Sequence, residues 1–247
     1  MKRLLVWLGL LLPAIVMAQD AKEIVARSDQ QFRGNSNKSE MTMTIVRPDW
    51  TREISMRSWS LGDDYSLILI LSPARDKGTA YLKRNNEVWN WQPSIQRTIK
   101  LPPSMMSQSW MGSDFTNDDL VRDVSIVDDY THSLLGTEEV DGHTCYKIEM
   151  IPKPDVPVVW GKVIQWIDTE NYWTIRAEQY DEEGYLVNIM KTSDIQNLGG
   201  RMLPAKMEMI PADATDQKTV ITYQSIAFNI DIETEFFSIQ NMKRLRP

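Results

Sequence analysis

The chain is poor in the residues that carry most metal, redox and nucleophilic chemistry. Among its 247 residues there is one cysteine, Cys145, and there are two histidines, His132 and His143. A single cysteine cannot form an internal disulfide, and the sequence contains no HExxH pattern, GxSxG elbow or glycine-rich phosphate loop. We therefore expect no metal, no cofactor and no enzymatic activity, and we read Cys145 as packed in or beside a strand.

Positive charge is also scarce and scattered along the chain. There are 34 acidic residues against 27 lysines and arginines, so the formal net charge is −7. Only the closing Lys243-Arg244-Leu245-Arg246 is locally basic. An acidic chain without a basic cluster argues against nucleic acid as a partner. It also argues against tight docking on anionic lipid, so contact with a membrane is expected to be transient.

Long apolar runs are confined to the N-terminus. The basic pair Lys2-Arg3 precedes the apolar segment 4–15, and a cleavage site of small or medium residues follows. This layout predicts a cleaved secretory signal peptide at residues 1–18. The apolar segment is too short to span about 30 Å of hydrocarbon, which argues against a membrane anchor. We expect residues 19–247 to form one domain in the periplasm.

The period of the apolar residues changes close to the start of the mature chain. Residues 21–32 carry one apolar stripe with the helical period of 3.6, with Asp20 before it as an N-cap and Gly34 after it as a stop signal. From about residue 38 the apolar residues alternate with a period of two, which predicts strands. The run 67–71 is apolar at every position and should be buried on both faces.

Turn signals divide the strand region into hairpins. Asn85-Asn86, Asp141-Gly142, residues 181–184 and Gly199-Gly200 each separate two alternating segments, and a last strand is expected at 219–228. This spacing predicts about ten or eleven antiparallel strands, and a sheet of that size curls. The fold class is therefore mostly β with a few helices: a curved antiparallel sheet forming an incomplete half-barrel covered by helices.

The middle segment, residues 104–122, is the second helical candidate, and a short turn at 233–237 is the third. Residues 116–119 (Thr-Asn-Asp-Asp) resemble a capping box. The nearby carboxylates of Asp114, Asp118, Asp119 and Asp123 could bind Ca²⁺, but EF-hand spacing and its glycine are missing. We favour the alternative that the first three lie around a helix N-terminus, where negative charge is stabilised.

Methionine and tryptophan are abundant, with 14 and 9 residues respectively. Methionine suits surfaces that accept apolar partners of variable shape, so a curved sheet rich in it could form an acyl-chain cleft. The same side chains would equally fill an ordinary core, and we weigh the two readings evenly. The candidates for a hydrophobic cavity wall are Met43, Ile45, Met56, Trp59, Leu69, Leu71, Trp89, Trp91, Trp166, Met190 and Met207.

The middle segment also contains candidates for an apolar lid over such a cavity. They are Met105, Met106, Trp110, Met111 and Phe115. Arg97 follows the tryptophan pair of the preceding strands and could act as a polar latch or a head-group contact. The equally weighted alternative is a surface arginine on a strand.

Three short motifs carry a family resemblance. They are Trp89-x-Trp91-x-Pro93 with Arg97 after it, the run 109–115 (Ser-Trp-Met-Gly-Ser-Asp-Phe), and 118–120 (Asp-Asp-Leu). In these motifs the chain resembles the LolA-like outer-membrane lipoprotein-sorting proteins, and in particular a longer, largely uncharacterised subgroup. The resemblance extends over nearly the whole mature chain, and the run 109–115 is its most specific part.

The resemblance implies a LolA/LolB-like incomplete antiparallel barrel whose open side is closed by helices around a hydrophobic cavity. It implies a periplasmic carrier or chaperone that binds acyl chains of lipoproteins or lipids for transport towards the outer membrane. An inner-membrane transporter of the ABC or RND type would be the donor. The alternative function is a non-enzymatic adaptor subunit of such an envelope transporter, and a lipid hydrolase ranks last.

Overall fold

The computed structural model describes residues 20–122, 125–214 and 216–247. The predicted signal peptide and Asp123 lie outside the described residues. Within those ranges, no helix is both long and apolar enough to cross a membrane. The elements are α1 (Ala21–Arg33), β1 (Ser36–Arg47), β2 (Trp50–Leu61), β3 (Tyr65–Ser72), β4 (Ala80–Arg84), β5 (Glu87–Gln92), β6 (Arg97–Leu101), η1 (Pro103–Met105), η2 (Asp118–Arg122), β7 (Tyr130–Val140), β8 (His143–Pro152), β9 (Lys162–Asp168), β10 (Thr174–Tyr180), β11 (Leu186–Leu198), β12 (Arg201–Pro211), β13 (Lys218–Phe228), η3 (Thr234–Phe236) and α2 (Ile239–Arg244).

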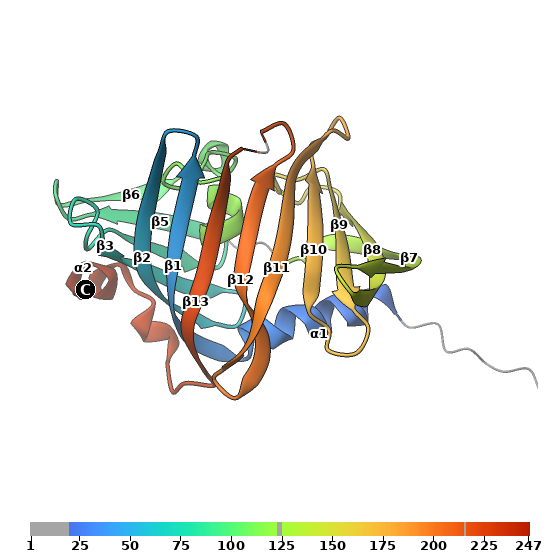
Figure 1. The fold of residues 1–247 in the computed structure, drawn as a ribbon. Coiled ribbons are helices and arrows are strands. Elements are labelled where there is room, and N and C mark those ends of the chain that lie inside the picture. The colour runs from blue at the N-terminus through green and yellow to red at the C-terminus, as the bar shows by residue number, and fades with distance from the viewer. Residues whose placement is uncertain (1–19, 123–124, 215) are drawn as a thin grey trace, which may run out of the picture.

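Thirteen strands form one continuous antiparallel sheet in the order β6-β5-β4-β3-β2-β1-β13-β12-β11-β10-β9-β8-β7. Figure 1 shows that the sheet is an open curve, with both ends bent behind the central strands. The prediction of a mostly β, curved antiparallel fold is confirmed. The strand number exceeds the predicted ten or eleven, and the edge strand β6 is mostly exposed and carries little apolar alternation.

The local signals of the sequence formed the expected elements. The Asp20 side chain accepts a hydrogen bond from the Lys22 backbone N–H at 2.9 Å, and Gly34 ends α1 with a φ of 61°. All four predicted turns connect neighbouring strands of the sheet. Gly199 is also required sterically, because an added Cβ would lie 2.3 Å from the carbonyl oxygen of Ile226.

Strand β3 is buried on both faces, as its continuous apolar run predicts. Ile68 and Ile70 join a core that includes Trp110 and Phe115 of the middle segment. Leu67 and Leu69 join a separate core with Phe237 and Met242, beneath η3 and α2. The C-terminal helices therefore cover the opposite face of β3 from the middle segment. A strand that is apolar on both faces needs a cover on each of them.

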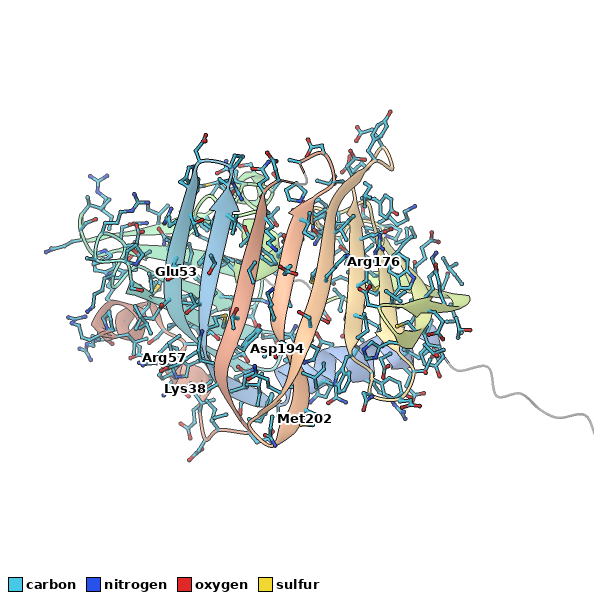
Figure 2. All side chains as sticks on the ribbon, viewed as in Figure 1. Lys38, Glu53, Arg57, Arg176, Asp194 and Met202 are labelled. Atoms are coloured by element: carbon cyan, nitrogen blue, oxygen red, sulfur yellow. The ribbon has the colours of Figure 1, made fainter. Side chains whose placement is uncertain are left out.

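The two faces of the central strands differ in polarity. Figure 2 shows Lys38, Glu53, Arg57 and Asp194 on the face toward the viewer. α1 and η2 lie behind the central strands, on the side toward which the sheet bends (Figure 1). Ile24 and Val25 of α1 pack there against Tyr130, Ile148 and Met150 of β7 and β8. The concave side is thus the apolar side of the sheet, and it is where a cavity forms.

Candidate functional site

A cavity of about 390 Å³ lies on the concave side of the sheet. Its walls come from β1–β3 on one side and β9–β13 on the other, and α1 and residues 115–120 also contribute side chains. Cavities of this size are typical of small-molecule and lipid sites. Most of its lining is apolar, and its flexible methionines are Met41, Met56, Met190, Met207 and Met209.

Polar side chains interrupt this apolar lining on both strand walls, in addition to charged side chains from α1 and the middle segment. On the β1–β3 wall, Ser39 and Ser58 share a hydrogen bond of 2.7 Å, and Ser60 and Ser66 are register partners on β2 and β3. On the other wall, Gln165 of β9 and Gln179 of β10 line the cavity. The cavity is therefore an apolar space with polar groups on both flanks, as expected for an amphiphilic occupant.

The middle segment is held over the cavity by the carboxylate of Asp119. Its Oδ1 accepts hydrogen bonds from Trp160 Nε1 at 2.8 Å and from Gln179 Nε2 at 3.1 Å. Its Oδ2 accepts from the backbone N–H of Thr116 at 2.8 Å, and its own N–H donates to Thr116 Oγ1. The predicted capping box is thus formed, although the helix that follows is a single π-helical turn, η2.

Burial of Asp119 disfavours its charged form. Desolvation raises the pKa of this carboxyl above its ordinary value, while the donors Trp160, Thr116 and Gln179 oppose the shift. Asp119 is also one of the side chains that line the cavity. It is therefore a partly buried acid that links the middle segment, β10 and the loop before β9.

A second anchor joins the middle segment to β1. Arg47 makes a two-pronged ion pair with Asp114, at 2.9 and 3.1 Å, and also donates to the carbonyl oxygen of Gly112. The two charged side chains are only 15% and 8% exposed. Thr219 Oγ1 donates to Asp114 at 2.7 Å. Ion pairing, capping and backbone contacts thus account for Asp114 and Asp119. No cluster of His, Cys, Asp and Glu in the described ranges is placed to hold a metal ion.

The structure brings some of the predicted site residues to the cavity. Met56, Trp59, Met190 and Met207 line it, and so does Phe115 from the predicted lid. Trp59 also packs on the opposite face, where its ring lies 5.4 Å from that of Phe236.

The other predicted wall residues lie elsewhere. Met43 and Ile45 are fully buried in the filled core beside the cavity, beneath Trp110. Trp166 lies on the outer side of β9, beneath Lys147 and Arg176. The residues placed in the core beneath η3 and α2 are Leu69, Leu71, Trp89 and Trp91.

Arg97 and the remaining lid candidates lie outside the cavity lining. Arg97 is exposed at the start of the edge strand β6 and does not line the cavity, a position that suits the surface-arginine reading. Met106 and Trp110 are buried against the sheet, and the Trp110 ring lies 5.4 Å from that of Tyr81. Met105 and Met111 are partly buried in the same segment.

Sequence reasoning missed the polar lining and much of the apolar lining. Ser58 and Ser60 flank Trp59, which packs mainly on the opposite face, and Gln165 interrupts an otherwise apolar strand. A polar residue at an inward-facing position of a buried strand is the sequence signal that could have indicated this polar lining. The apolar members that were missed include Phe32, Met41, Ile68, Trp160, Met209 and Ile221.

The cysteine and histidines make structural contacts. Burial, with a contribution from Asp168, raises the pKa of the Cys145 thiol to about 11, so it is protonated at neutral pH. His143 Nδ1 lies 3.0 Å from Asp168, whose other oxygen accepts from the backbone of Glu170 and Asn171 in the β9–β10 turn. This arrangement braces a hairpin and supplies no activated nucleophile.

Comparison with known proteins agrees with this architecture. A family model described only as an uncharacterized “-like” protein matches residues 62–244, and no curated protein matches the chain. A crystal structure of a DUF1329 family protein from Desulfovibrio piger is 26% identical, with a TM-score of 0.81, and the match covers 90% of this chain and 97% of that one. A LolA superfamily protein from Nitrosomonas europaea is 25% identical, with a TM-score of 0.79, covering 90% and 99%.

The chain belongs to the LolA-like family. The family model spans well over half of it, and both structures align over nearly their full lengths. The predicted resemblance is thereby confirmed. This LolA-like protein shares the fold of the LolA superfamily structure, and its described residues form an open curved sheet of thirteen strands with few helices.

Proposed function

We propose that this LolA-like protein is a periplasmic carrier that buries the acyl chains of a lipid or lipoprotein and releases them towards the outer membrane. The observation that supports the proposal is the apolar, methionine-rich cavity on the concave side of the sheet. Exposure of hydrocarbon to water costs about 0.8 kcal/mol per CH₂ group, so an acyl chain needs such a shelter to cross an aqueous compartment.

The proposed carrier is an incomplete barrel closed by α1 and residues 103–122. A carrier must also release its cargo, so one side of its cavity has to open without loss of the fold. Residues 103–122 suit this role because they contain two short helical turns and no strand, and polar anchors at Asp114 and Asp119 help to hold them. Such a segment can open while the ladder hydrogen bonds of the sheet stay intact.

The remaining parts of the proposal follow from the sequence and the family. Residues 1–18 would direct export, and residues 19–247 would form the single carrier domain. An inner-membrane transporter of the ABC or RND type would deliver the cargo, and contact with either membrane would be transient. No cofactor and no covalent step are needed, because burial of apolar surface supplies the free energy of binding.

The test is uptake of a fluorescent fatty acid by the delipidated mature protein. Met190→Trp places a larger side chain in the cavity and should weaken binding at least tenfold. Met202→Trp is the matched control, because Met202 is 52% exposed and lies outside the cavity lining (Figure 2). Equal binding by the two folded variants would contradict the cavity assignment.

Native mass spectrometry of protein purified from an envelope fraction would then identify the cargo. A lipid or acylated peptide at about one per chain is the expected result. A folded protein that arrives empty and also rejects added fatty acid would contradict the carrier proposal and support the adaptor alternative.

A further inference from the structure

An amide oxygen on the cavity wall is buried without a hydrogen-bond partner. Gln165 lies in the middle of β9, between Val163 and Ile167 on the inward face, and is 7% exposed. Its Oε1 accepts no hydrogen bond from any of the residues that the structure describes. A buried amide oxygen without a donor is destabilising, so a group that donates a hydrogen bond to it is favoured at this position.

The neighbouring amides on the same wall are satisfied, which makes Gln165 distinct. Asn188 of β11 donates to Gln179 Oε1 at 3.1 Å, and Gln179 in turn donates to Asp119. Gln165 pairs in register with Ala177, whose methyl group offers no hydrogen bond. The strand register therefore excludes Gln165 from the chain of hydrogen bonds that ends on Asp119.

A second unpaired polar atom lies across the cavity. Ser60 Oγ, on β2, is buried and likewise has no partner among the described residues. The rest of the wall between the two positions is largely apolar, with Met56, Met207 and Ile221. Two polar atoms without hydrogen-bond partners lie on facing walls of an apolar cavity. This arrangement suits a ligand that is mostly apolar but carries hydrogen-bonding groups.

We propose that Gln165 is a polar subsite that accepts a hydrogen bond from an amide N–H or a hydroxyl group on the acyl cargo. The inference rests on the proposed carrier function and names its substrate class: acyl chains that are amide-linked or hydroxylated, in preference to simple esters. Such a cargo would satisfy Gln165 Oε1, so the contact adds selectivity to apolar burial, which is not directional.

Two competitors of equal length test the subsite. N-methylpalmitamide carries an N–H group where methyl palmitate carries an ester oxygen, and each is titrated against the delipidated protein loaded with a fluorescent fatty acid. The wild type should bind the amide about five- to tenfold more tightly, the ratio expected for one buried hydrogen bond. Gln165→Met, which keeps the length of the side chain, should bring this ratio to about one.

Gln196→Met is the matched control, because Gln196 is an exposed glutamine outside the cavity lining and its loss should leave the preference unchanged. The melting temperature of the empty protein gives a second readout. It should rise by about 2–4 °C in Gln165→Met, because an unpaired buried amide is removed.

Each outcome has a distinct meaning. Equal affinity for amide and ester in the wild type, with the fluorescent fatty acid still displaced, overturns the subsite and leaves the carrier function standing. A preference that survives in Gln165→Met overturns it as well, and so does a lower melting temperature, since that would mean an internal partner was lost. Failure of the wild type to bind the fluorescent fatty acid at all contradicts the proposed function itself.

Discussion

Replacement of Asp119 by alanine should weaken the attachment of the middle segment to β10 and to the loop before β9. The substitution removes the acceptor of hydrogen bonds from Trp160 Nε1, Gln179 Nε2 and the Thr116 backbone. Each donor left unpaired in a buried place costs about 1–3 kcal/mol. The cavity beside Asp119 lets the freed groups relax, so the sum is smaller than three full penalties.

We therefore expect Asp119→Ala to lower the free energy of unfolding by about 3 kcal/mol. For a domain of this size that corresponds to a fall in melting temperature of about 6–12 °C. Asp119→Asn is the matched control. The asparagine keeps one oxygen as acceptor for Trp160 and Gln179 but turns an NH₂ group toward the Thr116 N–H. The fall in the free energy of unfolding should therefore be about half as large.

Thermal unfolding by circular dichroism measures both variants, and limited proteolysis reports on the segment directly. Cleavage within residues 103–122 should accelerate in Asp119→Ala while the sheet remains resistant. Unchanged melting temperature and unchanged cleavage would refute the role of Asp119 as an anchor. An equal loss in the asparagine variant would show that the charge, and not the acceptor geometry, matters.

The pH dependence of stability, measured for the wild type and for Asp119→Asn, tests the direction of the pKa shift. Burial raises the pKa of folded Asp119, so the folded state holds its proton more tightly than the unfolded state does. That contribution to stability is fully present when the pH is below the ordinary pKa of an aspartate, and it is lost as the pH rises through the raised pKa of the folded state. The stability of the wild type relative to Asp119→Asn should therefore decrease as the pH is raised from about 4. If the stability of the wild type relative to Asp119→Asn instead increases over this pH range, the inferred direction of the pKa shift is wrong.

Three further changes test the fold around the cavity. Gly199→Ala should destabilise the protein by at least 2 kcal/mol, roughly 4–8 °C in melting temperature, because φ is 61° and the new Cβ would lie 2.3 Å from the Ile226 oxygen. Arg47→Met should cost about 3 kcal/mol in chemical denaturation by leaving Asp114 buried without its ion pair, and restored stability in a double variant with Asp114→Asn would support this cause. Cys145 should resist thiol-reactive probes at pH 8 until the protein unfolds, because it is buried and its pKa is about 11; rapid labelling of the folded protein would refute that.

The local elements of this protein could be predicted from neighbouring residues in its sequence. The helix α1, with its cap at Asp20 and stop at Gly34, and the hairpin turns depend on residues adjacent in the chain, so their patterns predict them. The same holds for the two buried faces of β3 and for the capping box at Thr116 and Asp119. The family resemblance also rested on short contiguous motifs, such as the run 109–115.

Which apolar residues line a cavity depends on how distant parts of the chain pack together. Alternation along a strand tells which side chains share a face, but it does not tell what covers that face. Leu69 and Trp91 are as apolar as Met190 and Met207, yet α2 and the C-terminal segment fill the space over the first pair. The cavity exists because a thirteen-stranded sheet bends and a short segment closes it only in part. Both effects arise from contacts between residues far apart in the chain, such as that between Asp119 and Gln179, and no local pattern encodes them.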